Sequence, residues 1–208
     1  MLTIVEPFFD DFNEGNFTGW YMSNGTWTAA NNVLSSTGTG APIAWQGNTD
    51  ADMEVSLRYR IDDTSNSLAR AYIYFRFTDW NNNAWVRIFP GSIDLFKKTS
   101  GTATQLASTS TTSTQGTWYN LRIVADGNNV DVYRWADGAM PTKILTTTSC
   151  SYTSTTDFNI TVQTGFLFSF DDIRVLANSL SNTTTFAVNN ANEFTSMSDY
   201  DGTTTFGF

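Results

Sequence analysis

Apolar and polar residues alternate most clearly between Ser67 and Phe89, in two segments separated by a polar cluster at Asp79–Asn83. The first segment alternates an apolar set with an arginine and tyrosine set: Ala71, Ile73, Phe75 and Phe77 against Arg70, Tyr72, Tyr74 and Arg76. The second segment continues this division: Ala84, Val86 and Ile88 against Trp85, Arg87 and Phe89. Because strand side chains point alternately to opposite sides, the pattern predicts two strands joined by a turn. One face belongs to a core, whereas the arginine-rich aromatic face is costly to bury and is expected to meet a ligand, a partner or water.

The same period of two recurs along the rest of the chain. Residues 52–61 alternate an apolar set with a polar set: Met53, Val55, Leu57, Tyr59 and Ile61 against Glu54, Ser56, Arg58 and Arg60. A hairpin is expected around Asn31–Asn32, and a last strand of the main body within 165–176. No segment has a convincing helical pattern. Short strands at regular spacing, with turn clusters between them, predict an all-β antiparallel sandwich of the jelly-roll kind.

Composition and charge narrow the classes of function. The chain has 208 residues, of which 40% are hydrophobic and 15% charged, and its net charge of −9 argues against a nucleic-acid partner. It contains no histidine and one cysteine, Cys150. A Ser-His-Asp triad, a Cys-His pair and a zinc finger are therefore excluded, and Cys150 is expected to be an inert small side chain. No apolar run reaches membrane-spanning length, so no membrane insertion is expected.

The order of features from Phe8 to Leu176 resembles the concanavalin A-like, laminin-G-like jelly-roll superfamily. The resemblance rests on these pieces: DDF with Gly19–Trp20, ADMEVSLRYRI, YIYFRFTDWNNNAWVRI, GTWYNLRIVADGNNVDVYRW and FSFDDIRVL. It implies a jelly-roll, lectin-like domain over residues 1–177, with a curved sheet whose concave outer face forms a groove. Members of this superfamily include sugar-binding modules, adhesive domains and some glucanases.

The composition changes after Leu176. Residues 178–185 have the composition of a linker, and the following stretch, NNANEFTSMSDYDGTTTFGF, resembles part of one unit of the Rhs/YD-repeat family. Residues 178–208 are thus expected to form a linker and a partial YD-repeat-like segment, a short extension like a β-hairpin. The resemblance implies that the chain is part of a larger bacterial protein that is extracellular or on the cell surface.

The arginine-rich aromatic face is the candidate ligand site. If neighbouring strands pair in register, residues 54–60 extend this face, and the candidate ligand-binding residues are Arg58, Arg70, Tyr72, Tyr74, Arg76, Trp80, Trp85 and Arg87. Aromatic rings stack on sugar rings and arginines bind hydroxyls or carboxylates, which suits a glycan, with an anionic glycan as one option. Alternatively, these arginines only pair with aromatics and carboxylates, or a bulge reverses one strand's faces. The other tryptophans are expected to pack in the core or on the sheets: Trp20, Trp27, Trp45, Trp118 and Trp135.

Two pairs of aspartates form a candidate metal site. Asp10 and Asp11 lie in the expected first strand, and Asp171 and Asp172 in the last. First and last strands often neighbour each other in sandwiches of this kind, and four close carboxylates repel unless a cation neutralises them. A hard cation with oxygen ligands fits, and the resemblance implies a structural Ca²⁺. Alternatively, one aspartate of each pair is solvated while the other caps a turn.

Three functions remain open. The leading hypothesis is a non-catalytic carbohydrate-binding or adhesive module of a larger exported bacterial protein. The second hypothesis is a glucanase-like hydrolase that would use Asp52 and Glu54, two alternating carboxylates on one strand face. Two observations count against it: Asp50 stands where the glucanase pattern has glutamate, and these residues come early in the chain. The third option is a purely structural domain of a YD-repeat shell. The fold class does not choose among them.

Overall fold

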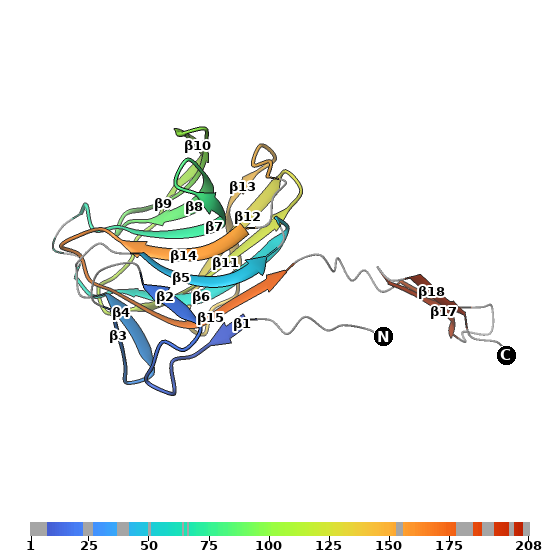
Figure 1. The fold of residues 1–208 in the computed structure, drawn as a ribbon, viewed down its shortest axis with the longest axis horizontal. Helices are drawn as coiled ribbons and strands as arrows, with labels where there is room; N and C mark the ends of the chain where they lie inside the picture. The colour runs from blue at the N-terminus through green and yellow to red at the C-terminus, as the bar shows by residue number, and fades with distance from the viewer. Residues whose placement is uncertain are drawn as a thin grey trace. The chain divides into compact units, whose positions relative to one another are not determined.

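The computed structural model describes residues 8–22, 27–36, 42–49, 51–63, 65, 67–152, 156–177, 185–188, 194–199 and 202–205. It has two compact units, Met1–Ala177 and Asn178–Phe208. In the first unit the strands form two antiparallel sheets, named here sheet A and sheet B (Figure 1). None of the described residues is helical, so the described chain contains no helix that could span a membrane. The predicted all-β sandwich is confirmed.

Sheet A has the strand order β13-β12-β11-β6-β15-β4-β3, and β1 also pairs with β15. Its strands are β1 (Phe8–Asp10), β3 (Trp27–Ala30), β4 (Val33–Ser36), β6 (Met53–Ile61), β11 (Trp118–Asp126), β12 (Asn129–Ala136), β13 (Thr142–Thr147) and β15 (Phe168–Ala177). The predicted hairpin is β3–β4, whose turn residues Asn31 and Asn32 have φ of 54° and 61°. Asparagine tolerates this left-handed conformation, which the tightest hairpin turns require.

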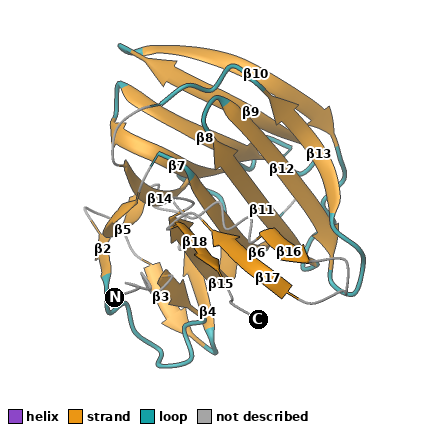
Figure 2. Ribbon diagram, turned by 90° about the vertical axis from the view of Figure 1, so that its right-hand side faces the viewer, coloured by secondary structure: helices purple, strands orange, loops and turns teal. Residues whose placement is uncertain are grey.

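Sheet B has the strand order β10-β9-β8-β7-β14-β5-β2 (Figure 2). Its strands are β2 (Trp20–Met22), β5 (Pro42–Thr49), β7 (Ala71–Asp79), β8 (Asn82–Ile88), β9 (Ser92–Thr99), β10 (Thr102–Ser110) and β14 (Thr156–Val162). The described residues of the second unit form one small antiparallel sheet of β16 (Thr185–Val188), β17 (Phe194–Asp199) and β18 (Gly202–Thr205).

The core lies between sheets A and B. Alternate residues of β6 from Met53 to Ile61 are buried, and Ala71, Ile73 and Phe75 of β7 belong to the same buried cluster from the other sheet. Cys150 is fully buried there, and burial raises the pKa of its thiol, as expected of an inert side chain. The alternation predicted from the sequence thus assigns these inward positions correctly.

The expected pairing of β6 with β7 is wrong. β6 pairs with β11 and β15 in sheet A, whereas β7 pairs with β8 and β14 in sheet B. The connection between them passes from one sheet to the other instead of forming a hairpin. Arg58 therefore lies on a different sheet from Tyr72 and Tyr74, and the predicted single arginine-rich face does not exist.

Candidate functional site

Six aromatic side chains form a continuous surface on the outer face of sheet B, named here the aromatic platform: Tyr72, Tyr74, Phe77, Trp80, Trp85 and Phe96. The rings of Trp85 and Phe96 stack with centroids 5.1 Å apart and planes 3° apart. Tyr74 lies 5.7 Å from Trp85 and 6.1 Å from Tyr72, centroid to centroid. The strand register explains this order, because Tyr74 pairs with Trp85, which pairs with Phe96 on the next strand. Neighbouring outward side chains on adjacent strands are close enough for such ring contacts.

A β-bulge near the end of β7 extends the platform. The register with β8 shifts between Phe75 and Asp79, and Arg76 has φ of 54°. The bulge reverses the faces, so that Phe77 joins the outer side, 5.8 Å from Tyr74 and 4.9 Å from Trp80 between ring centroids. Trp80, in the turn, is 52% exposed and forms the outermost ring.

The same bulge removes Arg76 from the predicted ligand-binding face. Its side chain is fully buried, and its guanidinium donates to the Ala51, Cys150 and Gly127 carbonyls and to Asp52, the last at 3.0 Å. These acceptors come from three separate segments. Arg76 therefore joins loops inside the protein, and the expectation that it faces a ligand is wrong.

Beside the platform, the outward positions of β14 and the residue after it are polar: Asn159, Thr161 and Gln163. In the strand register Asn159 pairs with Tyr74 and Thr161 pairs with Tyr72. The backbone N–H of Gln163 donates to the backbone carbonyl of Arg70. Each of the three carries a buried polar atom without a hydrogen-bond partner among the described residues: Asn159 Nδ2, Thr161 Oγ1 and Gln163 Oε1. We name these residues the polar column. Sequence reasoning missed it, although Phe158, Ile160 and Val162 alternate with these polar positions.

Unpartnered polar atoms concentrate on this face. Within the described chain, six buried side-chain atoms lack a partner, and five belong to the polar column, Trp85 and Arg70. Trp85 is 8% and Asn159 4% exposed. Buried polar groups are nearly always hydrogen-bonded, and each unpaired one costs about 1–3 kcal/mol. The described residues thus leave several polar groups on this face without a hydrogen-bond partner.

The two arginines on this face differ in their partners. Arg87 donates to Asp94 through Nε at 3.1 Å and Nη2 at 2.7 Å, and Asp94 also accepts from Ser108 at 2.6 Å. Arg70 has no carboxylate partner among the described residues, and its guanidinium carbon lies 6.0 Å from the centre of the Phe89 ring. The positive charge of Arg87 is therefore compensated by Asp94, whereas no carboxylate among the described residues compensates that of Arg70.

The outer face of sheet A carries Arg58, away from the platform. Arg58 pairs with Asp137 at 2.7 Å, Asp171 at 3.1 Å and Asp172 at 3.4 Å, and its guanidinium lies 4.9 Å from the Trp118 ring centre. Trp118 and Trp135 are half-buried on this face and do not belong to the core. Trp135 and Arg58 line a cavity of about 320 Å³. Trp20 and Trp27 pack against the core as expected, while the Trp45 side chain lies outside the described part of the structure.

The carboxylates considered for hydrolysis are held by arginines. Glu54 accepts from Arg122 at 2.7 and 2.6 Å, in a two-point contact. Asp52 accepts from Arg76 and from the Gly127 amide at 2.7 Å. Asp50 lies outside the described residues. Each of these carboxylates is thus occupied by hydrogen bonds within the protein, which leaves it poorly placed to reach a glycosidic oxygen.

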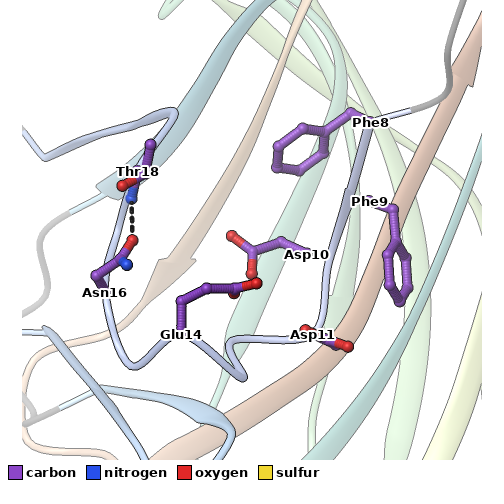
Figure 3. Close-up of a pocket in the computed structure, with 7 residues that line it drawn as sticks. All are labelled: Phe8, Phe9, Asp10, Asp11, Glu14, Asn16 and Thr18. Carbon is purple, nitrogen blue, oxygen red and sulfur yellow. Dashed lines mark hydrogen bonds between the residues drawn. The ribbon is translucent and has the colours of Figure 1, made fainter.

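A different acidic cluster lies at the end of β1. One carboxylate oxygen from each of Asp10, Asp11 and Glu14 falls within 4.8 Å of the others, beside a cavity of about 460 Å³. Figure 3 shows the Asp10 and Glu14 carboxylates directed toward each other. Asp10 also accepts from the Phe12 amide at 2.8 Å and from Trp20 Nε1 at 2.6 Å. Three carboxylates so close together have the oxygen chemistry that suits a hard cation such as Ca²⁺.

The acidic cluster contains two of the four predicted metal ligands, Asp10 and Asp11. β1 does pair with β15, but Asp171 and Asp172 turn to Arg58 and do not join the cluster. Glu14 takes their place, and the sequence analysis missed it. Burial raises the pKa of Asp171, and the nearby charges of Asp172 and Asp11 act in the same direction.

This chain matches the model of one protein family, and it is similar in fold to several solved structures. Residues 7–174 match the family described as 3-keto-alpha-glucoside-1,2-lyase-like domain. No curated protein matches the sequence closely enough to count as a relative.

Several solved structures share the fold. The carbohydrate-binding module CBM66 from Bacillus subtilis is 21% identical, with a TM-score of 0.63 over 76% of this chain and 95% of that chain. The VIP36 exoplasmic/lumenal domain, in its Ca²⁺/Man3GlcNAc-bound form, is 11% identical, with a TM-score of 0.65 over 76% and 84%. The GH43 protein BlXynB from Bacillus licheniformis is 18% identical, with a TM-score of 0.64 over 81% of this chain but 39% of that chain. At these identities the likeness concerns the fold alone.

Proposed function

The chain belongs to the family of 3-keto-alpha-glucoside-1,2-lyase-like domains, and we propose that it acts as a non-catalytic carbohydrate-binding or adhesive module. Its glycan lies on the outer face of sheet B. The single observation that carries this proposal is the pairing of the aromatic platform with the polar column, whose buried side-chain atoms have no partner among the described residues. Sugars need both kinds of surface, because their ring faces are apolar and their edges carry hydroxyls.

The platform provides the stacking surface. Tyr74 is central, since its ring contacts Tyr72, Phe77, Trp80 and Trp85. Burial raises the pKa of Tyr74 to about 12, so its phenol stays neutral at any physiological pH. A rigid, uncharged ring set loses little conformational entropy when a sugar stacks on it. This favours binding through ring faces and hydroxyls.

The alternative of hydrolysis is less well supported. The comparison with a GH43 protein covers only 39% of that chain, so its activity does not transfer to this domain. The candidate carboxylates, Asp52 and Glu54, are both held by arginines. Glu54 also lies on β6, which belongs to sheet A and not to the sheet of the platform. A binding role requires neither of them.

Calcium is part of the proposal as a structural ion. Asp10, Asp11 and Glu14 would hold it with their carboxylate oxygens. The bound ion would remove the repulsion among the three carboxylates and stabilise the turn after β1. Among proteins of the same fold, VIP36 was solved with Ca²⁺ bound. This ion would lie at the end of sheet A and would take no part in glycan contacts on sheet B.

We also propose an exported setting. The carbohydrate-binding proteins that share this fold include a lumenal domain and a bacterial binding module. The resemblance of the last residues to a YD repeat suggests a larger parent protein with this domain as one part. That resemblance remains a prediction.

A glycan array with neutral, uronate and sialylated sugars tests the binding function. We expect the wild type to bind at least one group of glycans. Tyr72→Ala should abolish that binding, whereas Tyr133→Ala, a matched tyrosine on the outer face of sheet A, should leave it unchanged. An array without binding, or equal binding by both variants, would contradict the proposal.

A further inference from the structure

Arg70 lies at one end of the aromatic platform, next to the polar column. Arg70 directly precedes β7, whose first residue, Ala71, pairs with Val162. The backbone carbonyl of Arg70 accepts from the backbone N–H of Gln163. Thr161 lies opposite Tyr72, the next outward residue after Arg70. Three polar atoms without described partners thus come together here: Arg70 Nε, Thr161 Oγ1 and Gln163 Oε1.

Two other outward arginines show how a carboxylate binds in this protein. Arg87 holds Asp94, and Arg122 holds Glu54, in each case through Nε and Nη2 together. In the Arg122 contact the two nitrogens meet the two carboxylate oxygens of Glu54, whereas both nitrogens of Arg87 donate to Asp94 Oδ2. Arg70 has the same edge, yet its Nε has no partner among the described residues. A guanidinium edge of this kind is suited to a carboxylate supplied from outside.

We infer that Arg70, Thr161 and Gln163 form a subsite for an acidic sugar, in which Arg70 binds the carboxylate side-on. The inference rests on the proposed glycan-binding function and names the class of sugar. Gln163 Oε1 is an acceptor that needs a donor, and Thr161 can donate or accept. A uronic acid offers both partners, since the ring carbon that bears its carboxylate is bonded to another ring carbon that can carry a hydroxyl. Its ring can lie on Tyr72, beside Arg70.

The net charge of −9 does not prevent this binding. Exposed charges more than about 8 Å apart are largely screened at physiological ionic strength, so the local partner of the carboxylate decides. Arg87, the neighbouring cation, is already neutralised by Asp94. Arg70 is therefore a positive charge without a carboxylate partner among the described residues at one end of the platform, while at the other end Lys98 donates to the Trp80 carbonyl at 2.8 Å. Arg70 Nε is covered in the free protein, so binding includes a rotamer change of this long side chain.

The test compares uronate oligosaccharides with their carboxyl-reduced counterparts of the same linkage. The probes are oligomers of galacturonate, glucuronate and mannuronate, each paired with its neutral form, and the measurement is isothermal titration calorimetry at two salt concentrations. We expect the wild type to bind at least one acidic oligomer about tenfold more tightly than its neutral partner. Added salt should reduce that preference, because the contact is an ion pair.

Arg70→Gln should make the two affinities of that pair equal by weakening the binding of the acidic oligomer. Arg174→Gln, a matched exposed arginine on β15, should behave as the wild type. Neutral-sugar binding without an acidic preference, or a preference that survives Arg70→Gln, overturns the subsite and leaves the proposed function standing. If neither member of any pair binds and the glycan array also shows no binding, both are overturned. Equal melting temperatures of wild type and Arg70→Gln would show that the variant is folded.

Discussion

Arg76 gives the sharpest prediction about stability, because its buried side chain joins three loops. Replacing it by methionine keeps a long apolar stem and removes the guanidinium. The carbonyls of Ala51, Gly127 and Cys150 then lose a donor, and Asp52 loses its cation. Removing one member of a buried ion pair typically costs about 3–5 kcal/mol.

That cost is a large part of the total stability of a domain, about 5–15 kcal/mol. For a domain of this size, each kcal/mol lowers the melting temperature by about 2–4 °C. We therefore expect Arg76→Met to melt roughly 6–20 °C below the wild type. Arg174→Met is the matched control, since Arg174 is exposed and its guanidinium contacts the Phe9 ring. It should change the free energy of unfolding by less than about 0.5 kcal/mol.

Thermal and urea unfolding, followed by circular dichroism, measure both variants. The urea experiment gives the free energy of unfolding, and an unchanged slope with denaturant would show that the folded and unfolded states still differ by the same exposed area. If Arg76→Met lies within about 1 kcal/mol of the wild type, a fraction of the expected buried-pair cost, the assignment of Arg76 as a buried link between loops is wrong.

Three further predictions concern the acidic groups. Calcium at a hundred times its dissociation constant should stabilise the wild type by about 2.7 kcal/mol, and Glu14→Gln should weaken that effect in calorimetric melting; a melting temperature indifferent to Ca²⁺ and to chelator removes the ion from the account. Burial raises the pKa of Asp171, so its carboxyl group binds a proton more tightly in the folded protein than in the unfolded chain. The contribution of Asp171 to the free energy of unfolding should therefore fall as the pH rises above its ordinary pKa of 3.8. Carbon-13 NMR should show that Ca²⁺ lowers this pKa by neutralising Asp11, and a pKa at or below 3.8 without calcium would refute the reasoning. Reducing sugar released by the wild type but not by Glu54→Gln would show hydrolysis, and we expect none from either protein.

The sequence was sufficient for the fold class and for the inward faces. The apolar residues of β6 and β7 alternate with period two, and that period directly reports which side chains share a face. It does not report which strands pair. The placement of Arg58 beside Tyr72 failed for this reason, because the link between β6 and β7 crosses between the sheets.

The bulge in β7 explains a second difference. Phe77 and Arg76 lie on the faces opposite to those expected, since β7 advances by three residues from Tyr74 to Phe77 where its partner β14 advances by two from Asn159 to Asp157. No local signal marks this bulge, because Arg76 is an ordinary residue in an unusual conformation with φ of 54°. Asn159 and Thr161, in contrast, alternate with apolar neighbours, so the sequence contained enough information to place them on an outer face.

The most direct test of the glycan site is where a bound sugar perturbs the protein. In a proton–nitrogen NMR spectrum, each tryptophan indole N–H gives one signal. Trp80 and Trp85 lie on the platform, whereas Trp118 and Trp135 lie on the outer face of sheet A. Titration with a glycan selected on the array should shift the Trp80 and Trp85 signals and leave Trp118 and Trp135 unchanged. Shifts confined to Trp118 and Trp135 would place the sugar on sheet A and contradict the account.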